Sequence, residues 1–222
     1  MLRLVLIPYS LLLAAAAACA QDVVTISPSD YKIEIENQWV RVLRVKHPAH
    51  AKIAMHQHPA SVAVFLTDVH EKITAPDGSV RKLDRKAGEV AYNEASKHAE
   101  ENVSDQPLEV AIIELKSGAP KSPPITIDPV KVDPSHHPVL LENSRVRVIR
   151  TILEPHLKAP MHDHPHYVVV YLTDLHTSMK MGDGRVVDNP RKPGDIAWRD
   201  ALTHQTVQEG DKTAVEIQVE IK

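Results

Sequence analysis

Two short stretches, residues 55–59 (MHQHP) and 161–165 (MHDHP), each place a histidine on either side of one polar residue. Each stretch is preceded by a His-x-Lys triplet and followed by an apolar run that ends in Leu-Thr-Asp. In a β-strand, residues i and i+2 point to the same face, so each stretch predicts two imidazoles side by side. Two neutral imidazoles on one face are good ligands for a divalent transition metal.

The similarity between these stretches extends along the chain. At a shift of about 106 residues, residues 24–116 align with residues 130–222 without a gap, and roughly a third of the aligned positions are identical. ENQWVRVLRV at 36–45 aligns with ENSRVRVIRT at 142–151, and RKAGEVAY at 85–92 aligns with RKPGDIAW at 191–198. We therefore predict a duplicated domain of about 90 residues, a period too long for a solenoid unit.

The repeat suggests domain boundaries. We predict an N-terminal domain at 21–117 and a C-terminal domain at 136–222. Between them, residues 118–135 are rich in Pro, Ser and Asp and are predicted to form a linker and a leading strand.

The local pattern within each copy favours strands. Residues 39–45 and 145–150 alternate apolar and basic side chains, which predicts a strand with one face in water. Residues 62–66 and 168–172 are apolar and predict strands that are buried on both faces. Asp-Gly pairs at 77 and 183 predict hairpin turns, and no segment predicts a helix longer than two turns. The fold class is therefore all-β, with a sandwich or barrel in each copy.

A third histidine recurs at the same spacing in both copies. His98 and His204 each follow a Gly-acid turn, Gly88-Glu89 and Gly194-Asp195. The predicted metal ligands are the six matched histidines: His56, His58, His98, His162, His164 and His204. His50, His156, His70 and His176 are also matched but are interpreted as surface residues or as partners behind the ligands, and His47, His136 and His137 as loop residues.

These motifs resemble the two motifs of the cupin superfamily, and the whole chain resembles a bicupin. MHDHPHYVVVYLTD resembles the first motif, a His-x-His followed by a Glu. KPGDIAWRDALTHQTVQ resembles the second, and in the N-terminal copy Asn102 falls where that motif carries an Asn. The resemblance implies two tandem jelly-roll β-barrels, each holding a metal in its mouth.

The resemblance has one departure. The usual Glu is absent from both copies, because its place falls within residues 61–63 and 167–169, which contain no carboxylate. The expected site is therefore of the three-histidine type, and cupins of that type include Fe(II) dioxygenases. The expected cofactor is a divalent transition metal (Fe, Mn, Ni, Cu or Zn), because imidazole suits many of these ions.

Several functions remain open at this point. One is a dioxygenase or isomerase that acts on a small organic molecule, with no catalytic base evident. The alternative is a metal- or small-ligand-binding protein of the cell envelope without turnover, and a storage role is a weaker third. Tyr167 and Trp198 make the C-terminal copy the expected site of the more polar pocket, although Tyr167 is expected to pack against the barrel wall.

The N-terminus predicts export. Residues 1–20 have the positive start, apolar run and small-residue cleavage site of a secretory signal, and the apolar run is too short for a membrane span. Cleavage after Ala20 would release a periplasmic or extracellular protein, whereas cleavage before Cys19 would give a lipoprotein anchored by that residue. The mixed charges and scarce aromatics exclude a nucleic-acid footprint. We expect a monomer or homodimer, since two barrels in one chain can pair with each other.

Overall fold

The computed structural model describes residues 22–222, so the signal peptide expected at residues 1–20 lies outside the described part. Each copy forms a five-stranded and a four-stranded sheet, and the strand order is the same in both copies. In the N-terminal copy, the strand order of the five-stranded sheet is β1 (Tyr31–Glu36), β2 (Val40–His47), β9 (Leu108–Leu115), β4 (Ser61–Phe65), β7 (Val90–Asn93). The strand order of the four-stranded sheet is β3 (Lys52–His58), β8 (Ser96–Asn102), β5 (Val69–Thr74), β6 (Val80–Arg85).

In the C-terminal copy, the strand order of the five-stranded sheet is β10 (Val139–Glu142), β11 (Val146–Leu153), β18 (Ala214–Ile221), β13 (Tyr167–Tyr171), β16 (Ile196–Arg199). The strand order of the four-stranded sheet is β12 (His162–His164), β17 (Leu202–Gln208), β14 (Leu175–Met181), β15 (Val186–Arg191). The predicted all-β class is confirmed, because the described part has two helices of four residues each, α1 (Val23–Ile26) and α2 (Pro129–Val132). No helix within residues 22–222 is long and apolar enough to cross a membrane.

The prediction of a leading strand within residues 118–135 is wrong. That segment contains α2, and β10 begins only at Val139. The Asp128 side chain accepts a hydrogen bond from the Val130 backbone N–H, and Pro129 occupies the first turn, where its missing N–H costs nothing. Asp22 caps α1 in the same way in the other copy.

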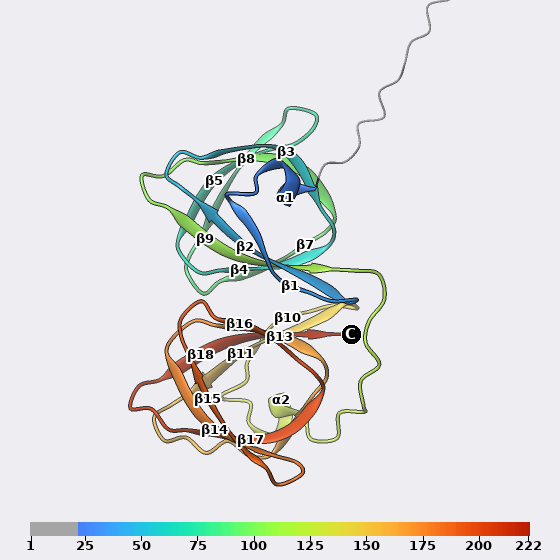
Figure 1. The fold of residues 1–222 in the computed structure, drawn as a ribbon, viewed down its shortest axis with the longest axis vertical. Coiled ribbons are helices and arrows are strands. Elements are labelled where there is room, and N and C mark those ends of the chain that lie inside the picture. Colours follow the sequence, from blue (N-terminus) through green and yellow to red (C-terminus); the bar gives the residue numbers. More distant parts are fainter. Residues whose placement is uncertain (1–21) are drawn as a thin grey trace, which may run out of the picture.

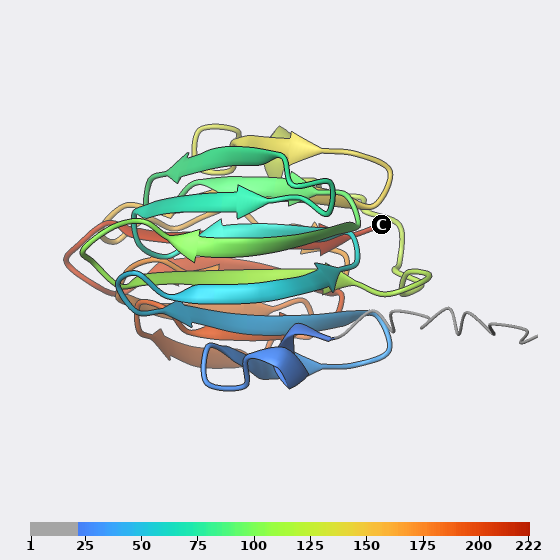
Figure 2. The ribbon, with the colours of Figure 1, turned by 90° about the horizontal axis from the view of Figure 1, so that it is seen from above.

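The five-stranded sheets of the two copies face each other across the middle of the molecule, and the four-stranded sheets lie at its two ends (Figure 1). Seen from above, the blue α1 and β1 and the yellow β10 lie at opposite edges, as expected for two copies related by an approximate twofold (Figure 2). One apolar cluster joins the facing sheets, with Val42, Val64 and Ile113 from one copy and Val148, Val170 and Ile217 from the other. Two further clusters fill the separate barrels.

The expectation that residues 39–45 form a strand with one face in water is wrong. In β2, Val40 and Val42 pack between the barrels, whereas Leu43 and Val45 pack inside the N-terminal barrel. The arginines are tolerated there because acids pair with them: Arg41 with Asp22 and Glu114, and Arg44 with Glu34 and Glu109. Both faces of the strand are therefore buried.

Candidate metal centres

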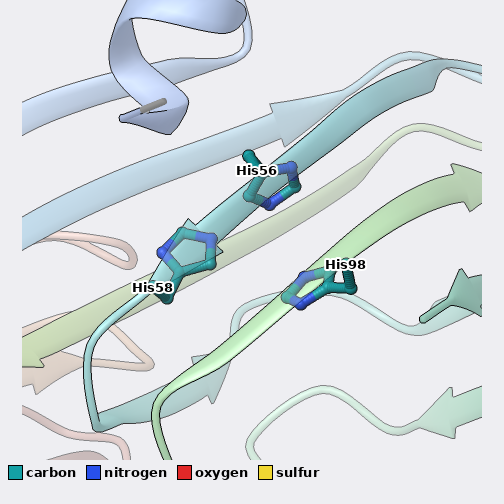
Figure 3. Close-up of side chains that lie close together, drawn as sticks. All are labelled: His56, His58 and His98. Atoms are coloured by element: carbon teal, nitrogen blue, oxygen red, sulfur yellow. The ribbon is translucent and has the colours of Figure 1, made fainter. Parts of the chain in front are cut away.

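The first histidine cluster lies on two neighbouring strands of the N-terminal barrel. His56 and His58 project from β3, and His98 projects from β8 directly opposite His56 (Figure 3). Ring centroids are 4.9 Å apart for His56 and His58 and 4.7 Å apart for His56 and His98. A ligand nitrogen from each ring lies within 4.8 Å of the other two. The structure therefore brings these three predicted site residues together.

A β-bulge in β3 sets the register in which β3 pairs with β8. Ile53 pairs with Glu100 and His56 pairs with His98, so β3 spans the interval with one residue more than β8. A bulge of this kind bends the strand and re-aims its side chains. Within it, the Ala54 carbonyl lies 2.8 Å from His56 Nδ1, which turns His56 Nε2 towards the cluster.

The second cluster repeats this arrangement in the C-terminal barrel. His162 and His164 lie on β12, and His204 lies opposite His162 on β17. The ring centroids of His162 and His204 are 4.6 Å apart, and the three ligand nitrogens again lie within 4.8 Å of one another. The Pro160 carbonyl lies 2.8 Å from His162 Nδ1, as Ala54 does for His56.

A carboxylate behind each cluster orients one imidazole. Glu114 Oε1 lies 2.7 Å from His58 Nδ1, and Glu220 Oε1 lies 3.0 Å from His164 Nδ1. The other oxygen of each carboxylate accepts a hydrogen bond from an arginine, Arg41 or Arg147. A carboxylate that accepts from Nδ1–H leaves the Nε2 lone pair free for a cation, which is the usual arrangement behind metal-binding histidines.

Five of the six imidazoles are held in the neutral form that binds metals, because their pKa is lowered. Burial lowers the pKa of His56 to about 4. Burial, together with the neighbouring His56 and His58, lowers the pKa of His98 to about 3. Burial also lowers the pKa of all three histidines in the C-terminal cluster.

Several of these nitrogens have no partner. Among the described residues, the buried Nε2 atoms of His56, His58, His164 and His204 make no hydrogen bond. An unpaired buried polar atom costs stability, and one divalent ion in each barrel would satisfy these nitrogens. The donor set therefore fits a transition metal in each barrel.

The N-terminal cluster has an additional carboxylate that the sequence analysis missed. Glu100 Oε1 lies 3.7 Å from His56 Nε2, and its Oε2 lies 3.6 Å from His98 Nε2. Burial raises the pKa of Glu100 to about 8, and Tyr31 donates a hydrogen bond to the carboxylate. The usual cupin Glu is absent from both copies, as expected, but Glu100 reaches this cluster from β8. The aligned residue of the C-terminal copy is Thr206.

The two barrels also differ in the space beside the histidines. The N-terminal barrel has a cavity of about 130 Å³, and its walls include His58, His98 and Glu100. The cavity of the C-terminal barrel is about 20 Å³, because Tyr167, Tyr171 and Arg199 occupy its interior. The C-terminal cavity is the more polar of the two, as expected. The space for a ligand, however, lies in the N-terminal barrel.

The remaining histidines divide into exposed and buried residues. His70 and His176 are exposed and pair with Asp84 and Asp188, so neither points into a barrel. His47, interpreted from the sequence as a loop residue, instead lies in β2, whereas His137 lies in a loop as expected; both are buried beside the clusters. His47 ends β2, and the His137 ring centroid lies 5.1 Å from that of His162.

Two further residues have roles that the sequence left open. The Asn102 side chain donates to the Pro48 and Gln106 carbonyls, so it holds neighbouring loops and does not line the cavity. Tyr167 is buried in the C-terminal barrel, with its ring centroid 5.0 Å from that of His164. It packs against the cluster from inside the barrel.

Comparison with solved structures identifies proteins of the same fold. AerE from Microcystis aeruginosa matches with a TM-score of 0.62 and 14% identity, covering 86% of this chain and 97% of that one. An oxalate decarboxylase variant from Bacillus subtilis matches with a TM-score of 0.57 and 12% identity, covering 86% and 75%. A cupin 2 conserved barrel domain protein from Leptotrichia buccalis gives a TM-score of 0.54 and 11% identity, covering 86% and 88%.

These matches extend across both barrels, so the chain has a two-barrel cupin-type fold with a histidine triad in each barrel. At such identities the likeness shows the fold and not the activity. No protein-family model matches the sequence, and no curated protein matches it significantly.

Proposed function

We propose that this protein is an exported, metal-dependent enzyme that acts on a small organic acid in its N-terminal barrel, as a dioxygenase or an isomerase. The observation that carries the proposal is the cavity of about 130 Å³ that borders His58, His98 and Glu100. Oxalate decarboxylase from Bacillus subtilis, a neighbour in fold, has Mn(II) centres. This supports a divalent metal in the present protein but does not identify which metal it binds.

The residues in and around the N-terminal triad would have distinct roles in the reaction. His56, His58 and His98 would hold the ion, with Glu100 as a fourth ligand. When bound, a divalent transition metal supplies Lewis acidity and open positions for substrate or O₂. Phe65, Leu108 and Ile112 line the cavity and exclude water from the reacting groups.

An anionic substrate is favoured by two arginines on β6. Arg81 and Arg85 both line the cavity, with Leu83 between them on the same face of the strand. Within residues 22–222 Arg81 forms no ion pair, and the only acid near Arg85 is Glu89 at 3.9 Å. A planar guanidinium binds a carboxylate in two parallel hydrogen bonds. These side chains would anchor the acid while its other end reaches the metal.

The second candidate is a metal- or small-ligand-binding envelope protein without turnover. The nearly filled C-terminal barrel supports it, because a cavity of about 20 Å³ has room for little more than water. In the proposed enzyme, this barrel has a structural metal and the N-terminal barrel performs the reaction.

The test uses mature protein from residue 21, loaded anaerobically with Fe²⁺ or Mn²⁺. O₂ consumption and NMR would follow turnover of small carboxylic acids and β-diketones. We expect turnover that His98→Ala abolishes and that the matched His204→Ala in the other barrel largely retains. Arg81→Ala should raise KM for the acid by about tenfold or more with little change in kcat. Metal binding without turnover of any compound would favour the binding protein.

Export has a separate test. The protein should be recovered outside the cytoplasm without residues 1–20, with Gln21 as its first residue, or with a lipid on Cys19. Mass spectrometry of the mature N-terminus distinguishes these two outcomes from an uncleaved cytoplasmic chain, which would refute export.

A further inference from the structure

We propose that the N-terminal barrel holds a second divalent cation beside the triad, bound by His47 Nε2 and Glu100, with Glu71 orienting the His47 ring from its Nδ1 and Glu100 bridging the two ions. The inference rests on the proposed function, because it assumes that the triad holds the first ion. It changes that function in one respect: the reacting centre would have two metals and not one.

The three residues come from three different strands and meet inside the barrel. His47 ends β2, Glu71 lies on β5 and Glu100 lies on β8. One ligand atom from each lies within 4.8 Å of the other two. All three side chains are buried, with at most 9% of the side chain exposed. The cluster therefore lies in the barrel interior and not on its surface.

His47 is positioned as a metal ligand. Its Nδ1 lies 3.0 Å from Glu71 Oε1, and this contact sets the orientation of the ring. Its Nε2 is buried, has no hydrogen-bond partner among residues 22–222, and lies 3.6 Å from Glu100 Oε1. An imidazole with one nitrogen bonded to a carboxylate and the other free is the usual arrangement of a metal-binding histidine.

The charges in the cluster call for a cation. Neither Glu71 nor Glu100 forms an ion pair with a lysine or arginine in the described part of the chain, and the basic groups within 4.0 Å of their oxygens are histidines. Buried carboxylates are normally paired with a cation or bound to a metal. Two divalent ions with two carboxylates leave a net charge of about +2, which suits a bound hydroxide and the anionic substrate proposed above.

Glu100 faces both ion positions. Its Oε1 lies 3.7 Å from His56 Nε2 and 3.6 Å from His47 Nε2, and its Oε2 lies 3.6 Å from His98 Nε2. A carboxylate in this position can bridge two ions. In two-metal sites of enzymes, such bridging groups hold the ions about 3.5–4 Å apart.

The duplicated copy supplies a natural control. At the positions that align with His47, Glu71 and Glu100, the C-terminal copy has Leu153, Thr177 and Thr206. The same strands form there without any of the three polar groups, so the fold does not require them. The C-terminal barrel keeps its triad but has no counterpart of these three groups at the aligned positions, and we therefore assign it one ion.

The experiment titrates Mn²⁺ into metal-free mature protein under anaerobic conditions, with bound metal counted by equilibrium dialysis and mass spectrometry. We expect about three equivalents, two in the N-terminal barrel and one in the C-terminal barrel, and a spin-coupled Mn²⁺ pair in the EPR spectrum. The double variant His47→Leu/Glu71→Thr, which copies the other barrel, should bind one equivalent less and lose the coupled signal. Circular dichroism would check that it folds.

The outcomes separate the two proposals. About two equivalents in the wild type, with an uncoupled spectrum at full loading, would overturn the second site and leave the triads intact. This result does not depend on the variant, so it holds even if the variant fails to fold. No bound Mn²⁺, together with no other transition metal after reconstitution, would overturn the proposed function as well.

Discussion

Glu100 lies two residues after His98, and this spacing decides its role. On a strand the two side chains share a face, so a carboxylate at this position reaches the same space as the histidine. The sequence analysis missed it because residues 96–102 (SKHAEEN) contain one apolar residue and show no alternation that would predict a strand there. His47 follows Leu43 and Val45 on the inner face of β2 by the same rule.

The carboxylate behind each triad gives a prediction at the residue scale. Glu114→Gln removes the acceptor that orients His58 and should weaken metal binding in the N-terminal barrel by about 10–100-fold. Isothermal titration with Zn²⁺ would measure this in the His204→Ala background, which isolates the N-terminal site. The control is Asp84→Asn, which alters an exposed His–carboxylate pair and should leave the affinity unchanged. Equal losses from both variants would contradict the assignment.

The neutral imidazoles predict a pH dependence of the metal-free protein. Burial lowers the pKa of His56 to about 4 and that of His98 to about 3, against 6.5 for the free group. As pH falls from about 7 towards 4, the unfolded chain gains protons that the folded protein does not, so the free energy of unfolding decreases. Glu100, with its pKa raised to about 8, acts in the opposite direction.

Comparison with a variant isolates the histidine contribution. The His56→Leu/His98→Leu protein should lose less stability than the wild type over this pH range in EDTA, as measured by the thermal midpoint. Identical pH profiles for the two proteins would show that these rings are not held neutral by the fold.

At the scale of the elements, the sequence predicted which histidines share a face of a strand, but it did not predict the strand pairing that holds them in place. Alternation placed His56 and His58 on one face, and the structure confirms this. The β-bulge at Ala54 and Met55 has no clear sequence signal, because it depends on the pairing of β3 with β8. For the same reason, the burial of both faces of β2 could not be read from its alternating arginines, whose partners are distant in sequence.

The middle residue of the second motif links its strand to the segment between the barrels. The Asp163 carboxylate accepts hydrogen bonds from the backbone N–H groups of Thr126 and Ile127 and from the Thr203 hydroxyl. Hydrogen bonds to a charged group contribute more than neutral ones, about 1.5–3 kcal/mol each. This side chain therefore attaches residues 126–127 to β12.

Replacing Asp163 by the residue of the other copy tests this attachment. Asp163→Gln should lower the free energy of unfolding by about 1–3 kcal/mol, measured by urea denaturation. Proteolysis should cleave the variant faster between the barrels. The control, Gln57→Asn, changes the aligned and exposed position and should have little effect. Unchanged stability and proteolysis of Asp163→Gln would refute the attachment.

At the scale of the whole molecule, the duplication was visible in the sequence, but the packing of the copies was not. Their five-stranded sheets share one apolar cluster. Two reciprocal hydrogen bonds also join the copies: Arg150 donates to the Gly88 carbonyl at 2.6 Å, and Arg44 donates to the Gly194 carbonyl. Each arginine thus binds the Gly-acid turn of the opposite copy. These turns have φ of +83° and +86°, which favours glycine.

The shared cluster predicts that the barrels unfold together. Ile217→Ala, which truncates a fully buried residue of this cluster, should lower the free energy of unfolding by about 2–5 kcal/mol. That corresponds to roughly 4–20 °C in the thermal midpoint for a chain of this size. Calorimetry of metal-free protein should show one transition for the wild type and for the variant. Two separate transitions, with only one shifted, would mean that the barrels are independent.

The most direct test of the account is the metal content of the mature protein, purified from residue 21 without chelators or a histidine tag. Elemental mass spectrometry should find at least about two equivalents of a transition metal per chain, one for each triad. His56→Ala/His58→Ala/His98→Ala should remove the N-terminal metal, and His162→Ala/His164→Ala/His204→Ala should remove the C-terminal metal. A protein that binds no metal, even after anaerobic reconstitution with Fe²⁺, Mn²⁺ or Zn²⁺, would contradict the claim that the two triads are metal centres.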